Sequence, residues 1–358
     1  MAQTRKGSTT TTFDRKAFRA GVIAALLGAA AIVVGSRNLR DFDWALTAYA
    51  VGCVFALFAV VYRYAIWSQR PPTRMYLKRG FQAFFRGGNS KASIPQNIGT
   101  LSRLLLENFV LQRFITRRSM ERWIMHACLS WGGMLAFGVT FPLVFGWIHF
   151  ESTAANAEMY RVLVAGMPVD RFLVHSLKGF LYFNLLNISA VMVLLGLVLS
   201  VKIRMSDKGE FATQTFADDL FPLLLLFAVC ITGLMLTVSA KFLAGSGFPF
   251  IGMTHAASVI GLLLYLPFGK LFHIIQRPLS LGVSFYKNVG FEGALARCRR
   301  CGEDYASQLQ VDDLKTVLDQ VGFNFRYATP AGELHYQDIC PPCRRRLLAL
   351  NQGRVLGR

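Results

Sequence analysis

Six apolar runs dominate the sequence, and each is long enough to cross a lipid bilayer as one helix. A bilayer core of about 30 Å needs roughly 20 helical residues. The runs cover residues 18–35, 44–67, 123–150, 172–201, 216–240 and 250–272. They predict an all-α membrane protein with six transmembrane helices. The basic residues before the first run also suit a secretory signal, but the run is longer than the apolar core of such a signal, which favours a retained span.

The composition and the charge agree with this class and exclude a soluble globular enzyme. Hydrophobic residues make up 53% of the chain and charged residues only 16%. The 39 Lys and Arg outnumber the 20 Asp and Glu, which gives a formal net charge of +19. In a membrane protein such an excess indicates topology rather than nucleic-acid binding. We therefore expect no nucleic-acid partner.

The basic residues are divided unevenly between the two sides of the predicted membrane. With a cytoplasmic N-terminus, 33 of the 39 Lys and Arg lie in cytoplasmic segments. The other six are Arg37, Arg40, Arg161, Arg171, Lys178 and Lys241. Because positive charge is retained on the cytoplasmic side, both termini are predicted to be cytoplasmic.

Residues 68–122 are too polar to span a bilayer, yet apolar side chains recur among them at helical spacing. The apolar positions are Leu101, Leu104, Leu105, Phe109, Leu111 and Phe114, and Arg103, Arg113, Arg117 and Arg118 lie among them. This pattern indicates an amphipathic helix on the anionic inner leaflet. A basic linker that only sets the topology is the alternative.

No internal repeat is visible, which weakens a transporter built from inverted halves.

Histidines in the apolar runs are candidate cofactor ligands, because ionisable side chains at membrane depth are rare and functional. His255 lies in the sixth run and His273 directly follows it, eighteen residues later, so one continuous helix would place them on the same face, about 27 Å apart. That arrangement suits two b-type haems stacked across the bilayer. His126 lies four residues inside Arg122, and His273 lies four residues inside Arg277. Their equal depth predicts His126 and His273 as the axial pair of an inner haem.

An outer haem would need a second ligand to pair with His255. His175 and His149 are the candidates, although both lie a turn or more further out than His255. We predict His175, because its helix continues well inside the membrane, and keep His149 as the substitute.

Short segments around these histidines carry a resemblance to a known family. They are Leu111-Gln112-Arg113, Met125-His126-Ala127-Cys128, Trp131-Gly132-Gly133 and the His255/His273 pair. Residues 111–277 resemble the four-helix core of the cytochrome b (gamma) subunit of respiratory nitrate reductases. They also resemble the related cytochrome domains of heterodisulfide-reductase-type and sulfite-reduction complexes. The resemblance implies that the His pair supplies one ligand to each of two haems, and that His126 matches the partner of the cytoplasmic-side ligand.

One position departs from the family pattern. The family carries a second His ten residues after the ligand that His126 matches, and this chain has Ala136 there. Either His175 or His149 replaces it, or the outer haem is absent. The resemblance further implies quinol oxidation near the outer haem, beside a Lys that Lys178 matches. His175 and Lys178 could serve a quinol headgroup as hydrogen-bond partner and proton acceptor. The alternative for Lys178 is a snorkelling anchor.

Four cysteines near the C-terminus form the most specific motif in the chain. They read Cys298-Arg-Arg-Cys301-Gly and Cys340-Pro-Pro-Cys343, two knuckles about forty residues apart. On the reducing side of a membrane this spacing predicts a tetrahedral S4 metal site rather than disulfides. The knuckles suit structural zinc or rubredoxin-type iron. Zinc is favoured, because Arg299, Arg300, Arg344, Arg345 and Arg346 crowd them and the second knuckle lacks a closing Gly.

The residues between the two knuckles predict further structure. Residues 311–321 indicate a short helix, with Leu314, Val317, Leu318 and Val321 facing inward. His335 is expected at the surface.

These observations divide the chain into four parts. Residues 1–67 hold two spans, 68–122 a basic amphipathic segment, 123–276 a four-helix haem-binding core, and 290–358 a cytoplasmic zinc-ribbon-like or rubredoxin-like domain. The leading hypothesis is a cytochrome b subunit of a respiratory complex in the prokaryotic inner membrane. It would hold one or two haems b and exchange electrons between quinone and a cytoplasmic iron–sulfur, flavin or molybdenum subunit. A haem-free anchor with a metal-binding tail and a proton-coupled transporter are the alternatives.

Overall fold

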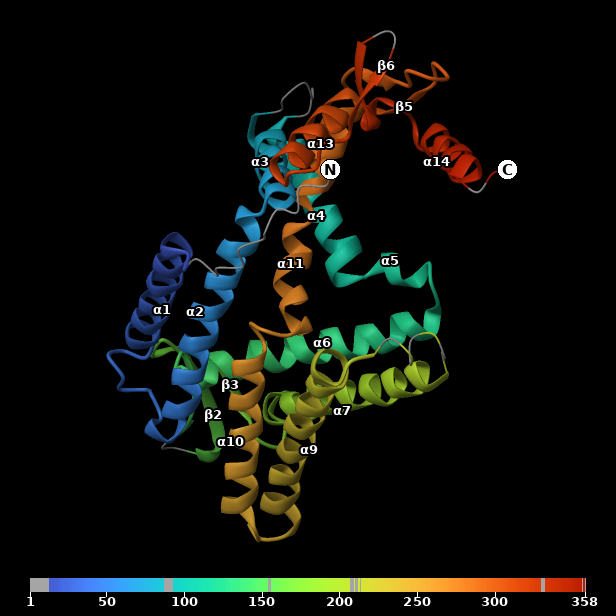
Figure 1. Ribbon diagram of the computed structural model, residues 1–358. Coiled ribbons are helices and arrows are strands. Elements are labelled where there is room, and N and C mark those ends of the chain that lie inside the picture. The colour runs from blue at the N-terminus through green and yellow to red at the C-terminus, as the bar shows by residue number, and fades with distance from the viewer. Residues whose placement is uncertain are drawn as a thin grey trace. The chain divides into compact units, whose positions relative to one another are not determined.

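The computed structural model describes residues 13–86, 93–153, 156–206, 209, 212, 214–329, 332–355 and 357. The chain divides into two compact units, each made of two separate stretches of sequence. The membrane unit comprises Met1–Ile66 and Leu111–Ile274, and the cysteine unit comprises Trp67–Val110 and Ile275–Arg358. Figure 1 shows the elements of both units.

Six helices of the described residues are long and apolar enough to cross a membrane, which confirms the predicted number of spans. They are α1 (Arg15–Gly35), α2 (Thr47–Gln69), α6 (Met120–Val144), α7 (Leu177–Ser206), α9 (Phe221–Phe242) and α10 (Phe248–Tyr265). A short 3-10 turn (Trp44–Leu46) leads into α2, and a π turn (Phe216–Leu220) leads into α9. The Asp14 carboxylate caps α1 by accepting from the backbone N–H groups of Lys16 and Ala17.

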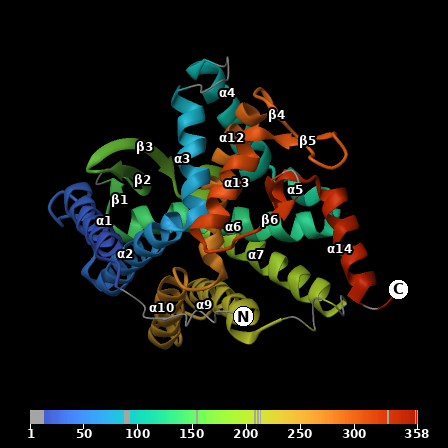
Figure 2. The same ribbon diagram turned by 45° about the horizontal axis from the view of Figure 1, so that its top comes forward.

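The last four spans pack in chain order: α6 against α7, α7 against α9, and α9 against α10 (Figures 1 and 2). Small residues allow the closest approaches. A Cβ at Gly132 would lie 3.0 Å from the Ser189 carbonyl oxygen, and one at Gly196 would lie 3.0 Å from the Met125 carbonyl oxygen. Ala190, Val193, Leu197 and Cys230 form the buried centre of this packing.

A three-stranded antiparallel sheet lies between α6 and α7 in the chain, and the sequence did not predict it. Its strands are β1 (Ile148–Thr153), β2 (Asn156–Val164) and β3 (Met167–Leu173). Ala165 and Gly166, both with positive φ, form the two-residue turn between β2 and β3. Phe150 and Phe172, which we predicted at the ends of spans, instead join an aromatic cluster with Tyr182 and Phe183 at the start of α7. The fold is therefore predominantly helical rather than all-α.

The sixth span is shorter than predicted, because its helix is interrupted. Helix α10 ends at Tyr265, a 3-10 turn covers Lys270–Phe272, and a separate helix α11 covers His273–Leu279. Pro267 has no N–H to continue the helical ladder, and Gly269 favours the break. The Arg63 guanidinium donates to the carbonyl oxygens of Pro267 and Gly269 at this break. The prediction that one continuous helix aligns His255 and His273 is therefore wrong.

The cysteine unit combines the segment between α2 and α6 with the tail of the chain. The first stretch contains α3 (Pro71–Arg86), α4 (Ile94–Leu105) and a π turn (Leu106–Val110). The second contains α12 (Gly282–Phe291), α13 (Gln308–Gln320) and α14 (Pro341–Val355), with two hairpins, β4 (Leu295–Arg297) with β5 (Asp304–Ser307) and β6 (Arg326–Thr329) with β7 (Gly332–His335). After the π turn of the first stretch the chain turns at Gln112, where the backbone is left-handed, into the short helix α5 (Arg113–Thr116) of the membrane unit. The predicted amphipathic helix is thus interrupted.

A polar cluster joins the two stretches of the cysteine unit. The Arg79 guanidinium of α3 donates two hydrogen bonds to the Asp313 carboxylate of α13, at 2.8 and 3.1 Å. The Tyr286 hydroxyl of α12 donates a third, at 3.0 Å. Burial and the nearby Asp313 raise the pKa of Tyr286, so the hydroxyl keeps its proton. This cluster fixes α3, α12 and α13 to one another.

Helices α3 and α12 also cross closely at two glycines. A Cβ added at Gly80 would lie 2.6 Å from the Gly282 carbonyl oxygen, so the backbone would have to move. We expect Gly80→Ala to destabilise the unit by about 1–3 kcal/mol. Gly99→Ala in α4 is the matched control, because no atom lies within 4 Å of its added Cβ, and it should stabilise by roughly 0.5–1 kcal/mol. Faster hydrogen exchange of the α12 amides in Gly80→Ala alone would verify the crossing, and equal exchange in both variants would contradict it.

Candidate metal centre and histidine sites

Two segments of the cysteine unit bring the four predicted cysteines together. Cys298 and Cys301 lie in the turn between β4 and β5, where Gly302 has a φ of +78° that favours glycine. Cys340 follows a short 3-10 turn (Tyr336–Asp338), and Cys343 lies in the first turn of α14. The second pair therefore sits at the start of a helix rather than in a knuckle like the first pair.

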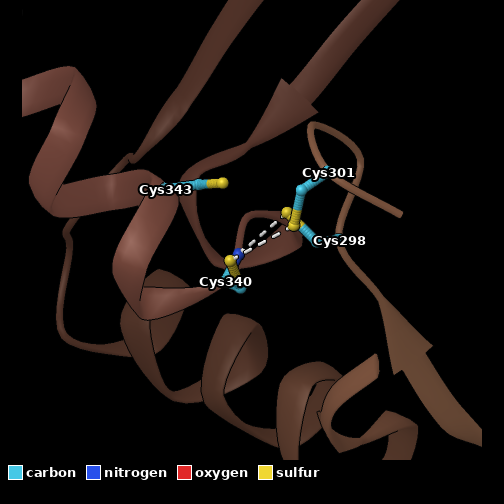
Figure 3. A group of neighbouring side chains, drawn as sticks. All are labelled: Cys298, Cys301, Cys340 and Cys343. Atoms are coloured by element: carbon cyan, nitrogen blue, oxygen red, sulfur yellow. Dashed lines mark hydrogen bonds between the residues drawn. The ribbon is translucent and has the colours of Figure 1, made fainter. Parts of the chain in front are cut away.

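The four Sγ atoms have the separations that a tetrahedral metal requires. All of them lie within 4.8 Å of one another, and the Sγ atoms of Cys301 and Cys340 are 3.7 Å apart (Figure 3). A tetrahedron with metal–sulfur bonds of about 2.3 Å has edges of about 3.8 Å. Cys298 and Cys340 are buried, whereas Cys301 is exposed. The four thiols therefore lie close enough together to hold one zinc or iron ion.

Backbone hydrogen bonds favour the thiolate form of the buried Cys298. The N–H groups of Cys340 and Arg300 donate to the Sγ of Cys298, at 3.3 and 3.4 Å. Burial alone would raise the pKa of Cys298, but these donors and the hydrogen bonds from Cys301 outweigh it and lower the pKa to about 6. Hydrogen bonding to Cys340 together with burial raises the pKa of Cys343 to about 12. A bound dication would promote ionisation of the four thiols.

A small core holds the two pairs of cysteines in place. Ile339 is buried beside Cys298 and Cys340, with Tyr305, Tyr327 and Leu347 packed around them. The backbone N–H of Arg299 donates to the Asp338 carbonyl oxygen at 3.0 Å and joins the two metal-binding segments directly. The Lys315 ammonium is 2.6 Å from the Asp338 carboxylate and helps to keep the pKa of Asp338 below its usual value against the effect of burial.

Two predictions about this part of the chain are corrected by the structure. His335 is buried, with 6% of its surface exposed, and its Nδ1 accepts from the Gln337 N–H. It therefore supports the turn before Cys340 and is not a surface residue. Val317 of α13 is buried as predicted, but Val321 is 44% exposed, because α13 ends at Gln320 and the chain turns away.

His126 of α6 is held by a residue that precedes its helix. The Nδ1 atom of His126 lies 2.7 Å from Oε1 of Gln112, which is only 3% exposed. Gln112 has φ 52° and ψ 38°, a left-handed conformation that is uncommon outside glycine. The Trp123 indole donates to the Leu111 carbonyl oxygen at 2.8 Å and fixes the same turn. Since an amide oxygen only accepts, Nδ1 of His126 carries the proton.

In His255 and His273, as in His126, the proton is on Nδ1. The Thr232 hydroxyl donates to the Ala228 carbonyl oxygen, so its oxygen is available to accept from Nδ1 of His255, 2.9 Å away. Nδ1 of His273 donates to the Lys270 carbonyl oxygen at 2.6 Å. With Nδ1 protonated, Nε2 has the lone pair with which an imidazole binds a metal. The tautomers therefore fit axial haem ligation, while the interrupted sixth span removes the argument that His255 and His273 share one helix face.

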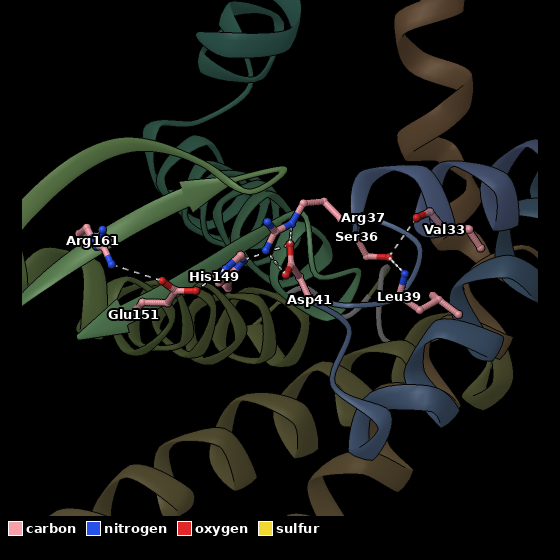
Figure 4. Close-up of polar contacts among 8 residues, drawn as sticks. All are labelled: Val33, Ser36, Arg37, Leu39, Asp41, His149, Glu151 and Arg161. Atoms are coloured by element: carbon pink, nitrogen blue, oxygen red, sulfur yellow. Dashed lines mark hydrogen bonds and ion pairs between the residues drawn. The ribbon is translucent and has the colours of Figure 1, made fainter. Parts of the chain in front are cut away.

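The candidate outer ligands lie outside the helices. His175 is exposed and precedes α7, so it is not inside a span. His149 lies in β1, where Nε2 is 3.4 Å from the Glu151 carboxylate and Nδ1 is 3.9 Å from that of Asp41 (Figure 4). Arg37 and Arg161 complete this row of charges. His149 thus belongs to a polar network of the sheet.

Lys178 lies in the first turn of α7 and pairs with a strand of the sheet. Its Nζ is 2.6 Å from the Asp170 carboxylate of β3, and the Tyr182 hydroxyl donates to the same carboxylate at 3.0 Å. The hydrogen bond from Lys178 lowers the pKa of Asp170. Lys178 therefore anchors the sheet to α7, and no sequence pattern indicates Asp170 as its partner.

Comparison with known proteins adds no relative: no protein-family model, no curated protein and no solved structure matches the chain.

Proposed function

We propose that the protein is an electron-transfer subunit of the prokaryotic cytoplasmic membrane. It would exchange electrons between the quinone pool and a cytoplasmic iron–sulfur, flavin or molybdenum subunit. The observation that carries this proposal is the common tautomer of His126, His255 and His273. Each has Nδ1 beside an acceptor, so Nε2 carries the lone pair that could bind a metal. The uneven distribution of Lys and Arg supports cytoplasmic N- and C-termini.

Within this proposal the histidines would hold haem b, which would supply one-electron transfer. His126 and His273 are the proposed ligands of an inner haem, and His255 of an outer haem. His175 is the better partner for His255, because His149 is engaged by Glu151 in the sheet. His175 and Lys178 would serve the quinone headgroup as hydrogen-bond partner and proton acceptor.

The cysteine unit would hold structural zinc in this proposal. Only a few buried residues surround the four cysteines, so a metal would contribute much of the stability of this part of the unit. The exposed Arg299, Arg300, Arg345 and Arg346 near the cysteines would favour an acidic surface on the soluble partner.

A spectrum of the purified protein tests the electron-transfer proposal. We expect a b-type α band after reduction with dithionite, and His126→Ala should remove at least one haem per chain, because the iron loses an axial ligand. His149→Gln is the matched control and should leave the haem content unchanged, since His149 faces Glu151. A colourless protein, or full haem content in His126→Ala, would contradict the proposal.

A second function is favoured by the interruption between α10 and α11. If the histidines serve only packing, the protein is a haem-free anchor that recruits a cytoplasmic partner through the cysteine unit. The same measurements separate the two functions. The anchor would be colourless and would still contain one zinc ion per chain, because the four cysteines are independent of the spans.

A further inference from the structure

We propose that α3 and α4 bind the surface of an anionic lipid bilayer through a leaflet face. The leaflet face is defined as the exposed residues Arg74, Lys78, Phe81 and Phe85 of α3 and Ile94, Ile98 and Leu105 of α4. This inference rests on the cytoplasmic location of the cysteine unit and is independent of haem or quinone.

On α3 the exposed residues form one stripe. At about 100° per residue, positions 74, 78, 81 and 85 fall within roughly 60° of the helix circumference. Phe81 is 66% exposed and Phe85 51% exposed, with ring centroids 4.5 Å apart. Other faces of α3 are occupied, since Gly80 packs on Gly282 and Arg79 bonds Asp313. The stripe thus places two cations before two aromatic rings.

On α4 the exposed stripe is entirely apolar. Ile94 is 48%, Ile98 52% and Leu105 37% exposed, and these positions fall within roughly 40° of one another. A different face of α4 packs on α3, where the buried Asn97 side chain donates to the Phe84 carbonyl oxygen at 2.9 Å. The contact through Asn97 makes the two helices one pair, and both stripes belong to it.

The occupant that suits this face is the membrane itself. A soluble module seldom leaves so many large apolar side chains in water. Helix α3 begins at Pro71, two residues after α2 ends at Gln69, so its first turn lies close to the bilayer. Residues 67–110 contain seven Lys and Arg against one acidic residue, Glu107. Basic residues are attracted to an anionic leaflet, and aromatic rings insert at its interface.

Photo-crosslinking of the full chain tests this proposal. Phe85 and Ile98 would be replaced, one at a time, by the photoreactive residue p-benzoylphenylalanine. The matched control is the same replacement at Arg103, which lies roughly 180° around α4 from Ile94. The variants would be reconstituted in vesicles of phosphatidylethanolamine and phosphatidylglycerol, and adducts identified by mass spectrometry. We expect lipid adducts at least fivefold more abundant at positions 85 and 98 than at 103.

Other outcomes would overturn the inference. Adducts to protein at positions 85 and 98 would assign the face to a partner, a second copy or another part of the chain. Equal lipid adducts at all three positions would show no preferred face. A variant could fail to fold. Only variants whose metal content equals that of the unmodified protein would therefore be compared. If a folded variant gives no adducts at positions 85 and 98, the face is open to water and the proposal is wrong.

Discussion

Replacing Cys298 by Ser should abolish metal binding by the full-length protein, from one ion per chain to background. Cys298 is buried, and its sulfur accepts backbone hydrogen bonds from both metal-binding segments. Removing the sulfur takes away one of four ligands and leaves three thiols in a geometry built for four. Cys340→Ser should have the same effect, because Cys340 is equally buried.

The stability of the tail should fall together with metal content. Structural zinc sites bind with free energies of about 10–16 kcal/mol, and much of this is folding free energy. We therefore expect α14 and the β4–β5 hairpin to lose protection from hydrogen exchange in Cys298→Ser and after treatment with a strong chelator. Elemental analysis gives the metal content and its identity, and a red protein would identify iron in place of zinc.

Cys53→Ala is the matched control for these variants, because Cys53 lies in α2 and its loss should leave the metal content unchanged. Cys301→Ser should be milder than Cys298→Ser, since Cys301 is exposed and a water molecule can replace its sulfur. Full metal content in Cys298→Ser would show that the four cysteines are not the metal site.

The four-cysteine group could be predicted from the sequence, because two short motifs specify it. Two Cys-x-x-Cys pairs fix the type and number of ligands whatever lies between them, and the fold only has to bring the pairs together. The six spans were accessible for a similar reason, since length and apolarity alone decide whether a helix can cross a bilayer. What the sequence did not reveal is that the segment after α2 folds together with the tail, because this depends on single contacts such as that of Arg79 with Asp313.

The ends of the spans were less predictable, because apolar residues continue beyond them. Phe150 and Phe172 extend the apolar runs, but their rings pack in the sheet beside α7. Pro267 and Gly269 do signal a break before His273, because proline has no N–H to continue the helical ladder. Gln112 could not be recognised as the partner of His126, since its role depends on a left-handed backbone that no sequence pattern specifies.

A second large effect is expected for Arg79→Met, which should destabilise the cysteine unit by about 2–3 kcal/mol. The substitution leaves the Asp313 carboxylate, only 7% exposed, with the Tyr286 hydroxyl as its remaining hydrogen-bond donor in this cluster. Breaking a buried ion pair on one side typically costs about 3–5 kcal/mol, because the other charge stays buried. The estimate is lower here because the Arg79 side chain is itself 40% exposed. Hydrogen exchange of the α13 amides measures the change.

Two further variants distinguish loss of the buried Arg79–Asp313 pair from loss of any positive charge. Arg103→Met is the matched control, because Arg103 is 75% exposed, forms only a 3.5 Å pair with Glu107, and should change stability by less than about 1 kcal/mol. The double variant Arg79→Met with Asp313→Leu removes both charges, so it should recover much of the stability lost in Arg79→Met. If the double variant were less stable than Arg79→Met, the buried carboxylate would not be the source of the loss. The two stretches of the cysteine unit would then be held together mainly by the apolar contacts of α3 with α12, such as that of Phe84 with Phe285.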